Sequence, residues 1–339
     1  MLLYIKTVCG GYVLKVVIGC LNSKYIHSSL APWGLAAGVK EFCGDDVFFR
    51  VLESTINGDV KEFAERIVSE KPDVVSFSCY IWNITKTLEA CSIIKKLCDC
   101  KIIVGGPEVA YRAEDVLTSS ADIDFVLCGE GEETFPEFIN TLSDNGDFSS
   151  VSGLVYRFQD KIIHNDEKEY TGTPISPYID EYFENLSGRI CYIETSRGCP
   201  YRCAFCLSGR CSTLRFFDLE QVKKDIVRLS NTGTKTVKFV DRTFNANHKR
   251  ANEIISFILE NRGKSISENV CFHFEIAGDI LTEETINLLS TAPIGVFQLE
   301  IGMQSFNEET LKAINRKTDT KKLIENIKKL VALNNMHIH

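Results

Sequence analysis

Short, apolar, β-rich runs alternate with amphipathic helical patterns along the first half of the chain, and this alternation is the strongest constraint on its fold. The apolar runs are residues 14–19, 47–52, 74–78, 102–104 and 123–127, and helical periodicity recurs at 28–42, 59–70, 84–97 and 132–142. Such alternation predicts an α/β domain with a doubly wound parallel sheet. Ligands of such sheets bind beyond the carboxyl ends of the strands.

The second half repeats the pattern. We expect strands at 190–194, 237–240, 271–276 and 297–301, a possible fifth at 336–339, and helices at 218–230, 248–262, 282–290 and 307–333. Repeated strand–helix units favour a TIM-type (β/α) barrel with its site at the carboxyl ends of the strands. A hairpin at 151–164 and a Pro-rich connector lie between the halves, so we place domains at 1–150 and 189–339 with residues 151–188 as hairpin and linker.

Cys199, Cys203 and Cys206 form a CxxxCxxC frame directly after the first strand of the second half. Three thiolates so close in sequence can hold three corners of a [4Fe–4S] cluster and leave one iron open for a small molecule. The alternative is a zinc site with Cys211 as fourth thiolate. Structural zinc usually takes two CxxC-type pairs or a Cys and His mixture, and no such second pair follows here.

The frame resembles the cluster motif of the radical S-adenosylmethionine enzymes, including Phe205 before the third cysteine and the Arg-Gly-Cys lead-in. The resemblance implies a partial barrel of six strand–helix units. It also implies that the open iron chelates the amino and carboxylate groups of S-adenosylmethionine. An electron from the cluster then cleaves this cofactor to a 5′-deoxyadenosyl radical.

Three further segments resemble the S-adenosylmethionine site of that family. Residues 239–245 resemble its FxDxxF segment, residues 299–306 resemble its ExGxQS motif on the fourth strand, and Asn315-Arg316 resembles its NR pair. Asp241 could instead cap the following helix, and Arg316 could form a surface salt bridge. The resemblance implies that the cofactor is bound by Phe205, Asp241, Glu275, Glu300, Gln304 and Arg316.

Small residues after the strands of the first half resemble those of a flavodoxin-like cobalamin-binding domain. Ser76, the Gly105-Gly106 pair and the segment GEGEETF at 129–135 carry the resemblance, which implies a slot for the dimethylbenzimidazole tail. The family's DxHxxG motif has no match; His27 lies in the right region and is either a cobalt ligand or a polar loop residue. The implied cobalamin-binding residues are His27, Ser76, Ser78, Gly105, Gly106, Gly129 and Glu130.

Composition sets the environment and the partners that we expect. Fourteen cysteines in 339 residues, without a signal peptide, indicate a reducing cytoplasmic location. The first twenty residues are too interrupted by Lys and Gly to span a bilayer. The net charge of −8 and the lack of a Lys/Arg block argue against a nucleic-acid partner. The resemblance implies an electron donor such as flavodoxin or ferredoxin.

Together the motifs predict a cobalamin-dependent radical S-adenosylmethionine enzyme that transfers a methyl group to an unactivated carbon or phosphorus centre. Two alternatives are open: the same cofactors could serve a radical rearrangement or cyclisation, or the chain could bind them as a sensor without turnover. The sensor alternative follows from the end of the chain after four clear barrel strands, which predicts either a truncated barrel or one that closes by other means.

Overall fold

The computed structural model describes residues 13–184, 186, 188–210 and 213–339. The chain divides into two compact units. The N-terminal unit extends to Tyr170 and includes Pro174–Tyr182, and the C-terminal unit comprises Thr171–Thr173 and Phe183–His339.

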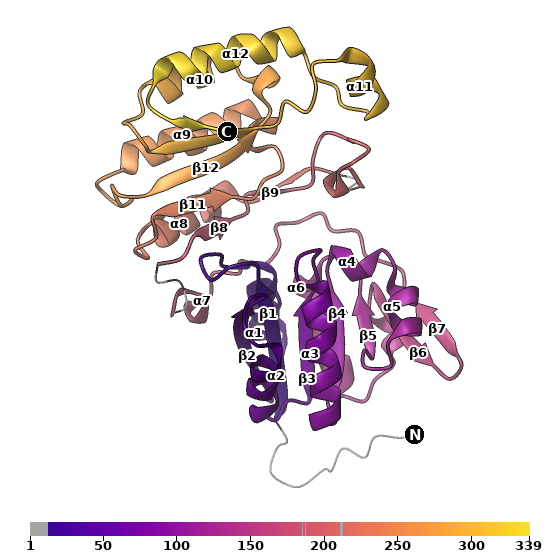
Figure 1. Cartoon of the computed structure of the whole chain (residues 1–339). Helices are drawn as coiled ribbons and strands as arrows, with labels where there is room; N and C mark the ends of the chain where they lie inside the picture. The colour runs from indigo at the N-terminus through magenta and orange to yellow at the C-terminus, as the bar shows by residue number, and fades with distance from the viewer. Residues whose placement is uncertain (1–12, 185, 187, 211–212) are drawn as a thin grey trace. The chain divides into compact units, whose positions relative to one another are not determined.

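The N-terminal unit is built on a sheet in the order β2-β1-β3-β4-β5-β6-β7 (Figure 1). Its strands are β1 (Leu14–Asn22), β2 (Val47–Thr55), β3 (Val74–Ser78), β4 (Lys101–Gly105), β5 (Phe125–Leu127), β6 (Leu154–Phe158) and β7 (Lys161–His164). Strands β1 to β5 pair in parallel, and the β6–β7 hairpin extends the sheet in antiparallel register. The order of the parallel strands is that of flavodoxin, which confirms the predicted doubly wound fold.

Helices cover both faces of this sheet. Helices α1 (Ala31–Phe42) and α6 (Gly131–Ser143) pack together, as do α2 (Val60–Ser69) and α3 (Ile84–Leu97). The short helices α4 (Pro107–Ala110) and α5 (Ala113–Ser119), the 3₁₀ turn η1 (Phe148–Ser150) and α7 (Asp180–Glu184) complete the elements before β8. Because both faces are covered, the central strands are buried on both sides, as the continuous apolar runs predict.

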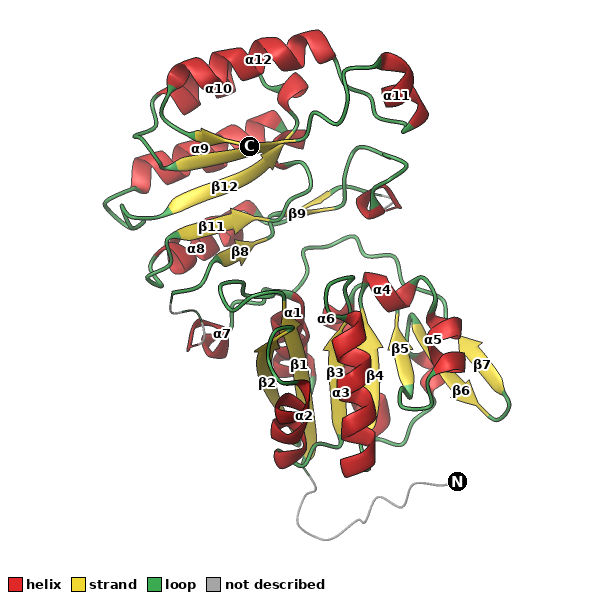
Figure 2. Cartoon of the chain, viewed as in Figure 1, coloured by secondary structure: helices red, strands yellow, loops and turns green. Residues whose placement is uncertain are grey.

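The C-terminal unit contains a parallel sheet in the order β14-β13-β12-β11-β8. Its strands are β8 (Cys191–Ile193), β11 (Thr236–Phe239), β12 (Cys271–Ile276), β13 (Phe297–Ile301) and β14 (His337–Ile338). Helices α8 (Leu219–Ser230), α9 (His248–Asn261), α10 (Glu283–Ser290) and α12 (Thr320–Leu333) lie along one side of it (Figure 2).

Side chains alternate along these strands in a way that divides the sheet into two faces. On β12, Phe272 and Phe274 are buried on one face, whereas Glu275 points to the other and is half-buried. The same alternation recurs at Lys238 on β11 and Glu300 on β13. Since successive side chains of a strand point to opposite faces, the polar side chains share one face of the sheet.

Two features of the C-terminal unit differ from the sequence prediction. The single helix predicted at 307–333 is wrong: α11 (Glu308–Ala313) ends before Asn315, whose backbone φ is +53°, and α12 begins again after Asp319. The side chain of Asp319 accepts the N–H groups of Lys321 and Lys322 and so caps the second helix. The antiparallel pair β9 (Ser196–Arg197) and β10 (Arg215–Phe216) was not predicted, because two-residue strands carry no periodicity.

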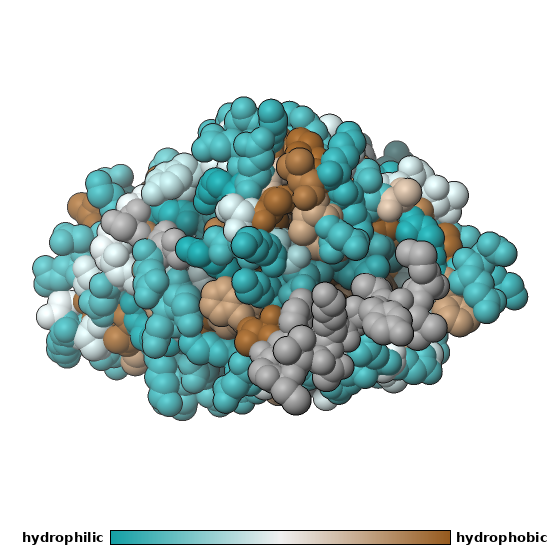
Figure 3. Space-filling model, turned by 90° about the horizontal axis from the view of Figure 1, so that it is seen from below, coloured by the Kyte–Doolittle hydropathy of each residue, from teal (hydrophilic) through white to brown (hydrophobic). Residues whose placement is uncertain are grey.

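A helix that crosses a bilayer needs about 20 largely apolar residues. No helix in the described part of the chain meets that requirement. Hydrophilic residues occupy most of the face shown in Figure 3, with smaller groups of hydrophobic residues between them.

Candidate functional site

The cysteine segment is a loop that is closed at its base. Strand β9 leads into it, β10 leaves it, and the two strands pair antiparallel. The N–H of Phe217 donates to the carbonyl of Thr195 at 3.0 Å, which adds a further bond at the base. Gly198 has a φ of +101°, and a Cβ there would lie 2.2 Å from the carbonyl oxygen of Thr213. The glycine before Cys199 is therefore required by the closure of the loop.

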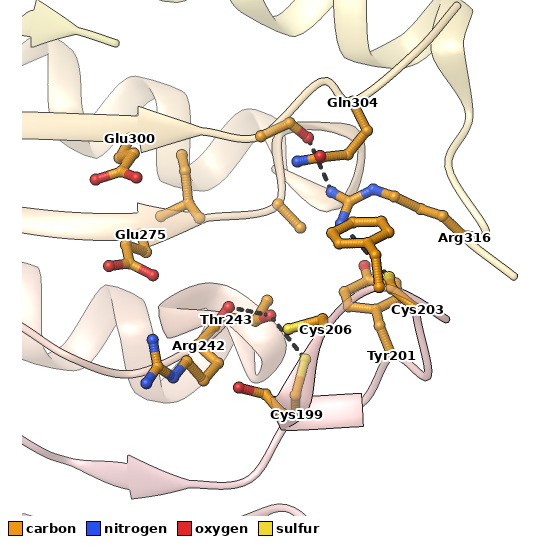
Figure 4. A pocket seen from close by; sticks show the side chains of 15 residues that line it. Cys199, Tyr201, Cys203, Cys206, Arg242, Thr243, Glu275, Glu300, Gln304 and Arg316 are labelled. Atoms are coloured by element: carbon orange, nitrogen blue, oxygen red, sulfur yellow. Dashed lines mark hydrogen bonds between the residues drawn. The ribbon is translucent and has the colours of Figure 1, made fainter. Parts of the chain in front are cut away.

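All three cysteines of the frame line one cavity of about 220 Å³ in the C-terminal unit (Figure 4). Its walls come from the cysteine loop, from the segment after β11, from the end of β12, from β13 with the turn that follows it, and from the segment after α11. The lining residues are Cys199, Tyr201, Cys203, Phe205, Cys206, Ser208, Arg242, Thr243, Glu275, Ile276, Ala277, Glu300, Gly302, Gln304 and Arg316.

The three thiols differ in exposure. Cys203 is buried, Cys199 is half-buried with its Sγ 3.6 Å from Thr243 Oγ1, and Cys206 is exposed. Among the described residues, no group of three or more His, Cys, Asp or Glu side chains is arranged to hold a single metal ion. Cys211, the fourth thiolate of the zinc alternative, lies outside the described residues. Three soft sulfur donors on one cavity fit the ligand set of a [4Fe–4S] cluster with one open iron.

Arg316 lies beside the buried cysteine. Its Nη1 is 3.8 Å from Cys203 Sγ, and its Nη2 donates to the carbonyl of Gly302 at 2.9 Å (Figure 4). The guanidinium also lies over the ring of Tyr201, 5.7 Å from its centroid. The Nε–H of Arg316 is buried and has no hydrogen-bond acceptor. A buried donor without an acceptor is costly, so this nitrogen is available to a ligand carboxylate.

The carboxylates of the cavity lie on neighbouring strands with a lysine between them. Lys238 Nζ is 3.5 Å from Glu275 Oε1 and 3.3 Å from Glu300 Oε2. Burial raises the pKa of Glu275, and the attraction of Lys238 opposes that change. Burial and then Lys238 lower the pKa of His273 to about 4, so His273 is neutral near pH 7. Arg242 also lines the cavity and attracts Glu275, so the two carboxylates are balanced by basic neighbours and can each accept a hydrogen bond from a ligand.

Asp241 does not line this cavity, unlike Glu275, Glu300, Gln304, Phe205 and Arg316. It is buried, and its carboxylate accepts the N–H of Thr195 at 3.1 Å, the Thr195 hydroxyl at 2.7 Å and the Ser196 hydroxyl at 2.5 Å. Burial raises its pKa to about 6, and these hydrogen bonds oppose the shift. Asp241 therefore holds the chain at the entrance to the cysteine loop, and its neighbour Arg242 lines the cavity instead.

The residues expected to bind cobalamin lie at the carboxyl edge of the N-terminal sheet. Ser76 and Ser78 are on β3, Gly105 ends β4, and Ser78 pairs with Gly105. Gly106 has a φ of +96°, and a Cβ there would lie 2.7 Å from the carbonyl oxygen of Cys79. The Ser76 hydroxyl is buried without a hydrogen-bond partner. Gly106 thus allows the backbone after β3 and β4 to approach closely, and the unsatisfied Ser76 hydroxyl is a group that a polar ligand could satisfy.

The other three predicted cobalamin residues lie in two loops at this edge. Gly129 follows β5, and Glu130 is the N-cap residue of α6, where its carbonyl accepts the hydroxyls of Thr134 and Tyr170. His27 follows β1, and its N–H donates to the carbonyl of Lys24 at 3.2 Å. Six of the seven residues thus belong to the loops and strand ends where ligands of doubly wound sheets bind, and Ser76 lies in the middle of β3. The roles of all seven stay predictions.

Sequence reasoning missed several residues of the cysteine cavity. Tyr201, Arg242 and Thr243 line it but were not predicted. The sequence did indicate Arg242 and Thr243 as candidates, because they follow Asp241 directly after β11, where side chains of a parallel sheet can reach a ligand. Motif matching selected the acidic residue, whereas only the backbone path decides which of the adjacent side chains faces the cavity.

Comparison with known protein families finds one matching family in each of the two units. Residues 16–139 match the B12 binding domain, and residues 193–336 match the radical SAM superfamily. The chain therefore belongs to the radical S-adenosylmethionine proteins that carry a cobalamin-binding domain. These two domains imply three cofactors: a [4Fe–4S] cluster, S-adenosylmethionine and cobalamin.

Individual relatives include enzymes of different reaction types. The chain is 28% identical over 297 residues to the cobalamin-dependent radical SAM methyltransferase TokK of Streptomyces tokunonensis, covering 83% of this chain and 43% of TokK. It is also 28% identical over 237 residues to the anaerobic magnesium-protoporphyrin IX monomethyl ester cyclase of Synechocystis, covering 65% of this chain and 45% of the cyclase. The chain thus spans less than half the length of these curated relatives.

A solved structure shows the same fold. The radical S-adenosylmethionine methyltransferase TsrM of Kitasatospora setae, with cobalamin and a [4Fe–4S] cluster bound, superposes with a TM-score of 0.75 at 17% identity. The match covers 96% of this chain and 66% of TsrM. The predicted α/β architecture is confirmed.

Proposed function

We propose that this chain carries the cofactor-binding part of a cobalamin-dependent methyltransferase that acts on an unactivated carbon or phosphorus centre. The observation that carries the proposal is the single cavity that brings Cys199, Cys203 and Cys206 together with Arg316 and the carboxylates of two strands. When bound, the cofactors supply the radical, the electron and the methyl group. The protein supplies binding, orientation and the exclusion of water.

The chain's own residues divide these tasks. The three thiolates would ligate the cluster, and Arg316 would receive a carboxylate with its unsatisfied Nε–H. Glu275, Glu300 and Gln304 would accept or donate hydrogen bonds to the ammonium and hydroxyl groups of S-adenosylmethionine. Glu275 and Glu300 are the carboxylates that line this cavity, and they would face the positively charged groups of that cofactor.

Cobalamin would bind at the carboxyl edge of the N-terminal sheet. The buried Ser76 hydroxyl would bond its nucleotide tail, which would lie beside the ends of β3 and β4. His27 is the candidate for the lower cobalt ligand in the loop after β1. An electron donor such as flavodoxin or ferredoxin, in a reducing cytoplasm, would complete the system.

The test is anaerobic reconstitution of the protein with iron, sulfide and a cobalamin, followed by assay with S-adenosylmethionine that carries a deuterated methyl group. We expect formation of 5′-deoxyadenosine, and we expect Cys203→Ala to abolish both the cluster absorption and this product. Absence of 5′-deoxyadenosine from reduced, cluster-loaded protein would contradict an enzymatic role and favour the sensor alternative.

The cyclase among the relatives favours a second candidate, a radical rearrangement or cyclisation with the same cofactors. Product mass distinguishes the two reactions. Transfer of the deuterated methyl group adds its mass to the product, whereas a cyclisation leaves no label in it. An unlabelled product that forms together with 5′-deoxyadenosine would replace methyl transfer by this second candidate.

A further inference from the structure

A second, larger cavity of about 530 Å³ lies on the surface of the C-terminal unit, between α11 and the start of α12. Lys312, Lys317 and Lys321 line it and are exposed. Arg202 in the cysteine loop is also exposed, and its carbonyl accepts Asn315 Nδ2 at 2.8 Å, which brings it beside this cavity. We call Arg202, Lys312, Lys317 and Lys321 the basic surface.

The charge of the basic surface is not neutralised by its neighbours. None of its four side chains forms an ion pair within the part of the chain that the structure describes. Two acidic residues, Glu308 and Asp319, line the cavity, so the four basic side chains outnumber them. The whole chain carries a net charge of −8, so the basic surface is a local exception that attracts anionic partners.

This surface is connected directly to the cysteine loop. The N–H of Ala204 donates to the carbonyl of Ile314 at 2.9 Å, and Asn315 bonds Arg202 as described. Arg316, the next residue, lines both cavities, and its Nη1 is 3.8 Å from Cys203 Sγ. The segment between the two helices therefore gives a short hydrogen-bonded path from the exposed lysines to a cluster ligand.

We propose that the basic surface is the docking site of a small acidic one-electron carrier protein. The proposal rests on the proposed function, because it assigns the entry point of the electron that this function requires. In each transfer the carrier loses one electron and the cluster site gains one, and no atom is exchanged. Contacts of this kind are small and transient, so complementary charge controls the rate of encounter.

The experiment reverses the charge of two lysines that lie outside the cysteine cavity. Lys312→Glu/Lys317→Glu is compared with Lys235→Glu/Lys264→Glu, a matched control in the same unit. Lys235 precedes β11 and Lys264 precedes β12, so the control residues lie at the amino ends of the strands. Both are exposed and, like the tested pair, form no ion pair within the described part of the chain.

Reduction of the reconstituted cluster is followed by EPR, once with reduced flavodoxin and once with dithionite. We expect the Lys312→Glu/Lys317→Glu variant to be reduced by flavodoxin about 10-fold or more slowly than wild type, with a weaker dependence on salt. Reduction by dithionite should be unchanged, and the control variant should behave as wild type with both reductants. Equal flavodoxin rates in the two variants, or an equal slowing with dithionite, would overturn the proposal.

A binding measurement separates this proposal from the proposed function. Titration of apoprotein with oxidised flavodoxin needs neither cluster nor turnover, and we expect affinity to fall for Lys312→Glu/Lys317→Glu alone. If the Lys312→Glu/Lys317→Glu variant loses affinity for flavodoxin and the wild-type protein makes no 5′-deoxyadenosine, the docking site is supported and the proposed enzymatic function is not. Unchanged affinity would overturn the docking site whatever the activity. Binding of inorganic phosphate to the basic surface of the wild-type protein, with no binding of flavodoxin, would also overturn it.

Discussion

Replacing Asp241 by asparagine should stabilise the C-terminal unit near neutral pH, although Asp241 lies next to the cysteine cavity and matches a cofactor motif. One carboxylate oxygen accepts the N–H of Thr195, and the other accepts the hydroxyls of Thr195 and Ser196. The amide oxygen of an asparagine can accept the N–H of Thr195. Its NH₂ group would then face the hydroxyls of Thr195 and Ser196, which can rotate to accept hydrogen bonds from it. The substitution thus retains the hydrogen bonds and removes a buried charge.

The size of the expected change in the free energy of unfolding follows from the pKa of Asp241. Burial raises the pKa of Asp241 to about 6 from 3.8, and this difference corresponds to about 3 kcal/mol between the two protonation states. A raised carboxyl pKa contributes stability that is complete below the unfolded pKa and is lost as the pH rises through about 6. Attraction between Asp241 and Arg250 reduces the gain on its removal. We expect asparagine to stabilise by about 1–3 kcal/mol at pH 7.5.

The assay is urea unfolding of the apoprotein at about pH 4.5 and about pH 7.5. Circular dichroism follows both units, whereas tryptophan fluorescence reports the N-terminal unit alone, because Trp33 and Trp82 both lie there. Relative to wild type, the asparagine variant should gain about 2 kcal/mol between the two pH values, with no shift in the fluorescence transition. Asp241→Ala should instead lose about 2–4 kcal/mol, because it leaves the Thr195 N–H unpaired. A pH-independent difference between Asp241→Asn and wild type would refute the reasoning.

Three other substitutions test the geometry. Gly106→Ala must accommodate a φ of +96° and a contact with the Cys79 carbonyl, so we expect a cost of about 1–3 kcal/mol and a loss of bound corrinoid, measured by absorption after gel filtration. Arg316→Met should weaken S-adenosylmethionine binding by about 10–100-fold in equilibrium dialysis while the cluster absorption persists; equal binding would remove Arg316 from the site. Asn245→Ala removes two buried bonds to the backbone of Ala277, at 2.8 and 2.9 Å, and should destabilise by about 2–4 kcal/mol in thermal unfolding, more than a surface Asn231→Ala.

Much of the fold could be predicted because its elements have strong periodicity. Strand β3 and helix α3 begin and end where the pattern indicated, since a continuous apolar run and a long amphipathic repeat leave few alternatives. The break between α11 and α12 was missed although its signal was present. The segment from Asn315 to Asp319 lacks apolar residues and ends in a capping aspartate, but helical periodicity on both sides concealed it.

The candidate site could be predicted only in part. The cysteine spacing identified a single cavity, because ligands three and four residues apart must lie close together. Asp241 was assigned to the cofactor because a motif gives residue types and not directions. After β11 the backbone turns Asp241 inward and Arg242 toward the cavity, and that choice depends on the partners Thr195 and Ser196, which lie at the start of the cysteine loop.

The closed base of the cysteine loop has a consequence for how the protein matures. Pairing of β9 with β10 and the bond between Phe217 and Thr195 hold the ends of the loop together, and the Asp241 carboxylate adds bonds to Thr195 and Ser196. None of these contacts involves Cys199, Cys203 or Cys206, so we expect the base of the loop to form without metal, unlike small zinc domains that fold only when metal binds. We therefore expect iron and sulfide to enter after folding, from the side of the exposed Cys206, and a damaged cluster to be rebuilt without unfolding of the chain.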